Sequence, residues 1–330
     1  MNPHAQFVII ISLAAGTVTT MLSNHWMLAW VGLEINTLAI IPLMTKIPHP
    51  RAIEAATKYF LIQAAASATV LFSSTSNAWF TGEWAINNLS HPLATTTMTI
   101  ALAMKIGLAP LHLWLPEVLQ GLTLQTGLIL STWQKLAPMA LLIQISHNTN
   151  LTLLMAGGIL STILGGWGGI NQTQLRKIMA FSSIAHIGWM ISVMKFAPHL
   201  SLFNLWIYLI MTSTMFLILI LLTTKKITDL SSAWTKTPTL TALSMLSLLS
   251  LSGLPPLSGF MPKWLIAQEL VKQNLTAFAT IILLSTLLSL FFYLRLAYIT
   301  ALTLAPNSSS STASWPQMNF TSTAPLISFT

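Results

Sequence analysis

The chain has 330 residues, of which 54% are hydrophobic and only 6% are charged, whereas an average soluble domain carries about 25% charged residues. Fourteen basic and six acidic side chains cannot cover the surface of a soluble globule of this length, so the composition excludes an ordinary soluble protein and indicates an exterior that faces lipid. The formal net charge is +8. The basic residues are nevertheless scattered singly or in pairs, which argues against nucleic-acid binding.

The sequence contains no cysteine, which excludes disulfide bonds and cysteine-ligated iron–sulfur or zinc centres. We therefore expect no redox centre in this chain. The stretch from Met1 to Thr20 contains neither Lys nor Arg, so it resembles neither a signal peptide nor a transit peptide.

Apolar segments long enough to cross a bilayer fill most of the chain. A spanning helix needs roughly 20 mostly apolar residues, and ten segments meet this requirement, which predicts an all-α polytopic membrane protein. In chain order they are residues 3–22, 25–45, 57–77, 93–117, 122–145, 150–170, 175–195, 200–223, 239–270 and 276–301.

The end of the sequence is different. Residues 305–317 are polar and rich in serine, and residues 318–330 are apolar again but too short to span. We expect residues 302–330 to be a polar linker and the start of an eleventh helix that is truncated.

The positions of Lys and Arg predict the orientation, since cytoplasmic or equivalent connections carry the excess of these residues. One side of the predicted bundle carries most of them, and Lys195 and Lys272 lie on the other. The majority group flanks the second, sixth and eighth connections and consists of Lys46, Arg51, Lys58, Arg176, Lys177, Lys225, Lys226 and Lys236. Because even-numbered connections share the side of the amino terminus, we expect the chain to begin inside.

Four charged residues stand out within the predicted spanning segments, namely Glu34, Lys105, Lys135 and Lys263. A charge at the bilayer centre costs about 2.5 to 3.5 kcal/mol on insertion scales, so these residues are candidates for function. A purely structural role in ion pairs leaves excess cations, because three lysines face one glutamate. Burial favours neutral lysine and a nearby carboxylate favours the charged form, so such a row can act as a proton relay.

Two of the predicted helices are interrupted by proline and glycine close to a buried lysine. Pro110 and Pro116 follow Lys105, and a cluster precedes Lys263 that consists of Gly253, Pro255, Pro256, Gly259 and Pro262. Broken helices at corresponding positions of two halves are typical of inverted-repeat transporters. We therefore expect two inverted five-helix repeats, residues 1–145 and 150–301.

Two histidines lie inside the predicted bundle, and the others lie at segment ends. His112 is within the first break, and His186 is in the middle of a segment beside Ser182 and Ser183. A neutral imidazole can donate and accept at once, so both are candidates for bridging between buried lysines, with satisfied core histidines as the alternative. Neither has a second His or carboxylate four residues further on, which argues against a metal site.

The glycine-rich stretch 165–169 lacks the third glycine of a dinucleotide loop, because Asn171 occupies its place. It also closes a predicted helix instead of following a strand. Close helix packing through small residues is the favoured interpretation. We expect no NADH site in this chain.

Three motifs resemble those of the antiporter-like membrane subunits of respiratory complex I. They are LAPLHLWLPEVLQG, QLRKIMAFSSIAHIGW and GLPPLSGFMPKW, and the opening MNP with VGLEINTLAIIPLM favours the vertebrate mitochondrial branch. The similarity extends from Met1 to about residue 301. It implies an antiporter-like fold, with Glu34 as the essential glutamate, Lys105 and Lys263 as the lysines of the two broken helices, and Lys135 as the connecting lysine.

The resemblance also implies a location and partners. The chain is expected in the mitochondrial inner membrane with its amino terminus in the matrix, together with neighbouring antiporter-like and other membrane-arm subunits and lipid. NADH and ubiquinone are then substrates of the whole complex, and this chain binds neither. Quinone reduction elsewhere would move charge at Glu34, and a proton would pass from Lys105 through His112 to Lys135, His186 and Lys263. Alternatives are a cation/proton antiporter subunit and a passive scaffold.

Overall fold

The computed structural model describes residues 3–235 and 237–302. Within this part of the chain the backbone forms helices, turns and two isolated β-bridges, with no strand. The expectation of an all-α protein is therefore confirmed. The predicted polar linker at 305–317 and the truncated helix at 318–330 lie outside the described residues.

The helices follow the apolar segments in chain order. The first half contains α1 (Pro3–Leu22), α2 (Trp26–Met44), α3 (Pro50–Thr81), α4 (Pro92–Ile106), α5 (Trp114–Gly121), α6 (Leu124–Ser131) and α7 (Trp133–Gln144). The second half contains α8 (Leu151–Ile170), α9 (Leu175–Val193), α10 (Pro198–Leu222), α11 (Ile227–Ser232), α12 (Pro238–Ser252), α13 (Phe260–Lys272) and α14 (Thr276–Leu302).

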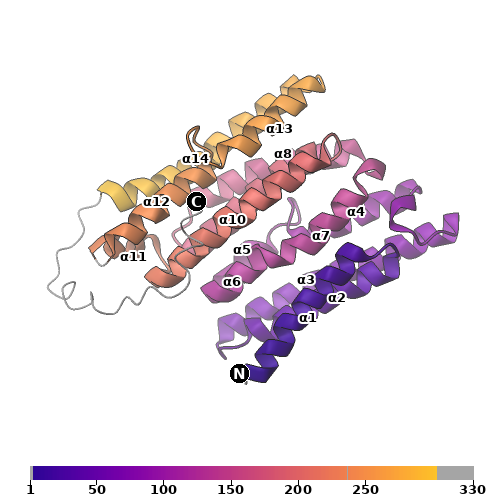
Figure 1. Ribbon diagram of the computed structural model, residues 1–330, viewed down its shortest axis with the longest axis horizontal. Helices are drawn as coiled ribbons and strands as arrows, with labels where there is room; N and C mark the ends of the chain where they lie inside the picture. Colours follow the sequence, from indigo (N-terminus) through magenta and orange to yellow (C-terminus); the bar gives the residue numbers. More distant parts are fainter. Residues whose placement is uncertain (1–2, 236, 303–330) are drawn as a thin grey trace.

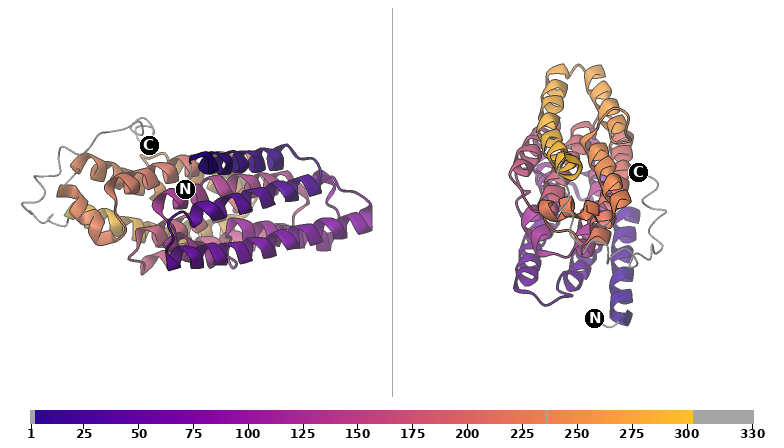
Figure 2. Two further views of the ribbon diagram at one scale, coloured as in Figure 1. Left: turned by 90° about the horizontal axis from the view of Figure 1, so that it is seen from below. Right: turned by 90° about the vertical axis from the view of Figure 1, so that its left-hand side faces the viewer.

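The helices lie side by side in one elongated bundle. Helices α1 to α3 form one side of it and α12 to α14 the opposite side, with α4 to α10 between them (Figure 1). Seen from below, most helices run along the long direction of the bundle (Figure 2). Six of the described helices are long and apolar enough to cross a membrane, namely α1, α2, α3, α8, α10 and α14.

The two expected helix breaks lie between α4 and α5 and between α12 and α13. Helices α4 and α12 both run for 15 residues from a proline. Gly107 ends the first with φ 85° and Gly253 ends the second with φ 83°, left-handed conformations that favour glycine. The helix after each break begins seven residues later, at Trp114 and at Phe260. The two breaks therefore share one local design.

Three features differ from the sequence prediction. Helix α3 begins at Pro50, before the expected residue 57, because the His49 side chain accepts a hydrogen bond from the Arg51 N–H at its start. It continues to Thr81, where Gly82 ends it with φ 78°. The segment 122–145 is not continuous, since Thr132 interrupts it between α6 and α7. Helix α11 was not predicted, because it is too short and polar for a hydropathy pattern.

The connections between helices gather at two ends of the bundle. At one end, His25 forms a β-bridge with Ala85, and Lys195 donates to the Thr149 carbonyl at 2.7 Å. At the other end, Gln174 forms a bridge with Lys226. Odd-numbered and even-numbered connections thus lie at opposite ends, as the chain of antiparallel segments requires.

The glycine-rich stretch 165–169 packs α8 against its neighbours. A Cβ atom on Gly165 would lie 2.7 Å from the Ala185 backbone nitrogen of α9, and one on Gly166 would lie 2.7 Å from the Leu288 Cβ of α14. Contacts this short leave no room for a side chain. The interpretation as a small-residue packing surface is confirmed.

Candidate functional site

The three intramembrane lysines are all buried beside helix interruptions. Lys105, Lys135 and Lys263 have exposed fractions of 6%, 3% and 9%. Lys105 lies in the last turn of α4, whereas Lys135 and Lys263 lie in the first turns of α7 and α13. Among residues 3–235 and 237–302, no carboxylate lies within the ion-pair distance of 4.0 Å of these ammonium groups.

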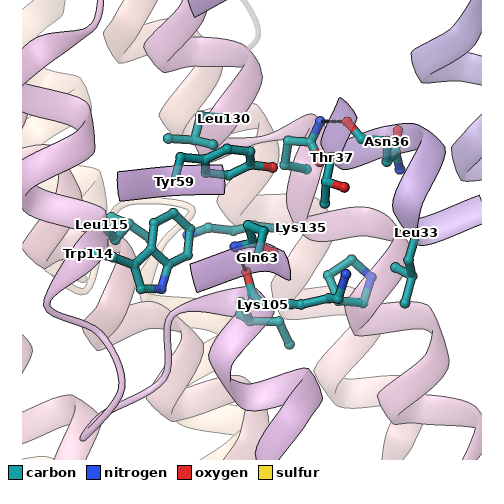
Figure 3. A pocket seen from close by; sticks show the side chains of 13 residues that line it. Leu33, Asn36, Thr37, Tyr59, Gln63, Lys105, Trp114, Leu115, Leu130 and Lys135 are labelled. Atoms are coloured by element: carbon teal, nitrogen blue, oxygen red, sulfur yellow. Dashed lines mark hydrogen bonds between the residues drawn. The ribbon is translucent and has the colours of Figure 1, made fainter. Parts of the chain in front are cut away.

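A small cavity joins Lys105 to Lys135. Its volume is about 20 Å³, which is room for about one water molecule. Figure 3 shows the side chains that surround it, with Gln63 and Tyr59 from α3 and Trp114 from α5. The Lys105 Nζ has no hydrogen-bond partner among the described residues, so a water in this cavity would satisfy it. The first broken helix and α7 therefore line the same cavity.

Lys135 has a partner on its other side. Its Nζ donates to the Tyr208 hydroxyl at 3.1 Å, and the Tyr208 hydroxyl donates to the Ser131 carbonyl at 3.2 Å. The same Nζ lies 5.0 Å from the centroid of the Tyr208 ring, which is cation–π distance. The partner of this lysine is thus a neutral group, the Tyr208 side chain.

A second cavity joins His186 to Lys263. It has a volume of about 10 Å³ and is also lined by Trp189, Ser289 and Tyr293. The Lys263 Nζ donates to the Ser252 carbonyl at 2.7 Å, at the end of α12. The His186 ring lies 5.5 Å from the ring of Tyr208, between centroids. The break between α12 and α13 thus supplies the acceptor for Lys263, and His186 connects this lysine to Tyr208.

Glu34 stands at the start of the row. Its side chain is half-buried on α2, and its Oε2 is buried without a hydrogen-bond partner in the described part of the chain. The carboxylate interacts electrostatically with Lys105 and with Tyr59. It does not line the first cavity, although its neighbours Leu33 and Thr37 do.

His112 is buried in the break between α4 and α5, as its position in the sequence indicated. It is not among the residues that line either lysine cavity. Its Nδ1 is buried without a hydrogen-bond partner in residues 3–235 and 237–302. The two cavities and the contacts of Tyr208 thus link four of the six candidate residues, Lys105, Lys135, His186 and Lys263; Glu34 interacts electrostatically with Lys105, and His112 lines neither cavity.

Comparison with known proteins decides the family. A family model described as NADH:quinone oxidoreductase/Mrp antiporter, TM matches residues 23–289, and one described as NADH dehydrogenase subunit 2 C-terminus matches residues 290–330. The chain is 65% identical to the NADH-ubiquinone oxidoreductase chain 2 of Xenopus laevis over 315 residues, which are 96% of this chain and 91% of that protein. It is 62% identical to the chain 2 of Salmo salar, over 97% of this chain and 92% of that one.

The chain belongs to the NADH-ubiquinone oxidoreductase chain 2 family. It is accordingly a membrane-arm subunit of NADH:quinone oxidoreductase and assembles with other membrane-arm subunits. The family expected from the three motifs is confirmed.

Solved structures agree with this family. A chain of respiratory complex I from Thermus thermophilus, solved with bound aureothin, has a TM-score of 0.83 and 27% identity, and the match covers 94% of this chain and 75% of that one. A chain of the Mrp complex from Dietzia has a TM-score of 0.79 at 19% identity, over 88% of this chain and 59% of that one. The second likeness shows the antiporter-like fold alone.

Sequence reasoning missed Tyr208 and Gln63. Tyr208 looks like one aromatic residue in an apolar helix, but it shares a buried helical stripe with Ser201, Asn204 and Thr212. Such a polar stripe in a spanning helix is the signal that could have found it. Gln63 donates to the Lys105 carbonyl at 3.4 Å, and its position in α3 carries no comparable signal.

Proposed function

We propose that this subunit carries protons across the membrane along the row Glu34, Lys105, Lys135, His186 and Lys263, with His112 as an accessory group at the first break. One observation carries the proposal: three lysines are buried with no carboxylate at ion-pair distance among the described residues, and two small cavities and Tyr208 connect them. A bundle built only for stability gains nothing from such groups, because an unpaired buried charge is costly.

The driving force comes from elsewhere in the complex. NADH oxidation and ubiquinone reduction take place in other subunits, and this chain binds no cofactor and holds no redox centre. Its lack of cysteine supports this assignment. Charge movement along the membrane arm acts on Glu34, which acts on Lys105 in turn. Moving one charge against 100 mV requires about 2.3 kcal/mol, a scale that displacement of one buried charge can supply.

The fold is proposed to consist of two inverted five-helix repeats with ten spans, residues 1–145 and 150–301. The matched lengths of α4 and α12 and their glycine ends support this pairing. So does the placement of one β-bridge in each half, at opposite ends of the bundle. Lys105 lies two residues before its glycine and Lys263 ten residues after its own, so the two lysines reach the breaks from opposite sides.

The proposed location is the mitochondrial inner membrane, with the amino terminus in the matrix. The end that carries Arg51, Arg176 and Lys226 then faces the matrix, in line with the excess of basic residues there. Labelling tests this orientation in intact mitoplasts. A cysteine introduced at Ala85 is expected to react with an impermeant maleimide, and one introduced at Lys225 is expected to react only after the membrane is opened. The reverse pattern would invert the topology.

The transport itself is tested with the purified complex in liposomes. Lys263→Met removes the charge at the end of the row while keeping an unbranched side chain. Protons pumped per NADH oxidised should fall, and quinone-linked turnover should decrease about tenfold. Lys272→Met is the matched control on the same helix, because the Lys272 side chain is exposed and pairs with Glu269 at 3.7 Å.

The alternative activity is cation/proton exchange, which the likeness to the Mrp complex chain keeps in view. The same liposome assay distinguishes proton translocation from cation/proton exchange. Proton uptake that persists unchanged when choline replaces sodium and potassium supports proton translocation. A strict requirement for either cation, or a Lys263→Met complex that pumps normally, contradicts the proposal.

A further inference from the structure

Tyr208 contacts both Lys135 and His186. Lys135 lines the first cavity and His186 the second, and Tyr208 lines neither. Its exposed fraction is 1%. The Lys135 Nζ lies 3.1 Å from its hydroxyl, and the His186 ring lies 5.5 Å from its ring. Tyr208 therefore lies between a residue of the first cavity and a residue of the second.

The interruption at Thr132 provides the second partner of the Tyr208 hydroxyl. In a continuous helix the Ser131 carbonyl would accept from the N–H of Lys135. That N–H instead donates to the Thr132 carbonyl at 3.3 Å. The Ser131 carbonyl is thereby free to accept from the Tyr208 hydroxyl at 3.2 Å. One helix kink thus places a backbone acceptor and a lysine at the same phenol.

The Tyr208 hydroxyl can either accept a hydrogen bond from Lys135 or donate one to it, depending on whether the lysine is charged. An ammonium group has three donors and no acceptor, whereas a phenol has one donor and free lone pairs. While Lys135 is charged, the phenol oxygen must accept from it and the phenol proton must point elsewhere. The Ser131 carbonyl accepts it at 3.2 Å, and the side chains of Ser183 and Thr212 also interact with the hydroxyl. A neutral amine has a lone pair, and the phenol can then donate to it.

We propose that Tyr208 is a positioning residue whose hydroxyl switches between these two hydrogen bonds. When Lys135 gives up its proton, the hydroxyl turns from the Ser131 carbonyl and donates to the Lys135 amine; when the lysine is protonated again, the hydroxyl turns back. The tyrosine keeps its own proton throughout. The switch gives both forms of a buried lysine a partner without any carboxylate, and it rests on the proposed proton-carrying role of Lys135.

Tyr208→Phe tests the switch in the assembled complex. Phenylalanine keeps the ring beside His186 and over Lys135 and removes only the hydroxyl. Quinone-linked turnover should fall about tenfold, as for loss of one hydrogen bond to a charged group. The fall should differ between mildly acid and mildly alkaline pH, because the charged and neutral forms of Lys135 lose different hydrogen bonds. Tyr298→Phe is the control, since Tyr298 is exposed on α14.

Three results would overturn the switch: normal turnover, the same fractional loss at every pH, or failure of the Tyr208→Phe complex to assemble, which would show a structural role. Failure of the switch is distinguishable from failure of the proposed function. If Lys135→Met lowers proton pumping and Tyr208→Phe does not, the relay stands and only the switch is wrong. If Lys135→Met pumps normally, the relay itself is wrong.

Discussion

Complex I with Lys135→Met is expected to assemble normally and to lose most of its quinone-linked turnover. Lys135 both lines the first cavity and donates to Tyr208, so it joins the first cavity to the rest of the proposed row. Methionine keeps the unbranched shape and removes the ammonium group. Without a titratable group here, protons at Lys105 have no described route to His186. We expect a fall of at least about tenfold in turnover, equivalent to about 1.4 kcal/mol.

The thermal stability of the Lys135→Met complex should rise or stay the same, although its turnover falls. Lys135 is buried with no carboxylate at ion-pair distance among the described residues, so its charged form has a desolvation cost that methionine lacks. The Tyr208 hydroxyl keeps the Ser131 carbonyl as its acceptor and is not left unpaired. The thermal midpoint of the purified complex should therefore stay equal or rise.

The control for this experiment is Lys46→Met, because Lys46 is exposed at the end of α2. Electron transfer from NADH to a hydrophilic acceptor should be unchanged in both variants, since that reaction does not use the membrane arm. A Lys135→Met complex with a lowered thermal midpoint and normal pumping would show that the lysine is structural.

The order of the helices and the position of both long breaks could be predicted from the sequence, for a physical reason. Apolar length marks a membrane span, and Pro110 or Pro256 cannot continue a regular helix. The extra turns of α3 could not be predicted in the same way, because hydropathy detects lipid contact and not helix length. The polar first turns around Glu54 and Lys58 are helical without being apolar.

The connections among the candidate residues could not be predicted. Glu34, Lys105, Lys135 and Lys263 stand out one by one, because each is a charge in an apolar segment. The contact of Lys135 with Tyr208 joins α7 to α10, and the two residues are 73 residues apart in sequence. Such a contact depends on how α7 and α10 pack, and no local pattern carries that information. The sequence has no proline or glycine at Thr132, where the kink frees the Ser131 carbonyl, so nothing in it marks this interruption.

The second large effect is expected for Glu34→Gln, which should lower quinone-linked turnover and proton pumping together while the complex still assembles. Glu34 is the carboxylate that acts electrostatically on Lys105, and the two side chains form no ion pair within 4.0 Å. Each keeps one buried polar atom without a hydrogen-bond partner in the described residues. Two groups that are coupled by field and not locked together can exchange charge without breaking a strong bond.

Glutamine keeps the size and hydrogen-bonding capacity of Glu34 and removes its charge, so the half-buried side chain should not disturb the packing of α2. Lys105 then loses the charge that favours its protonated form. Quinone-linked turnover and proton pumping should fall together, by about tenfold, while NADH oxidation by a hydrophilic acceptor stays normal. Glu83→Gln is the matched control, because Glu83 is exposed in the connection after α3. If the Glu34→Gln complex assembles fully and keeps both its turnover and its proton stoichiometry, Glu34 is a structural residue and the row begins at Lys105.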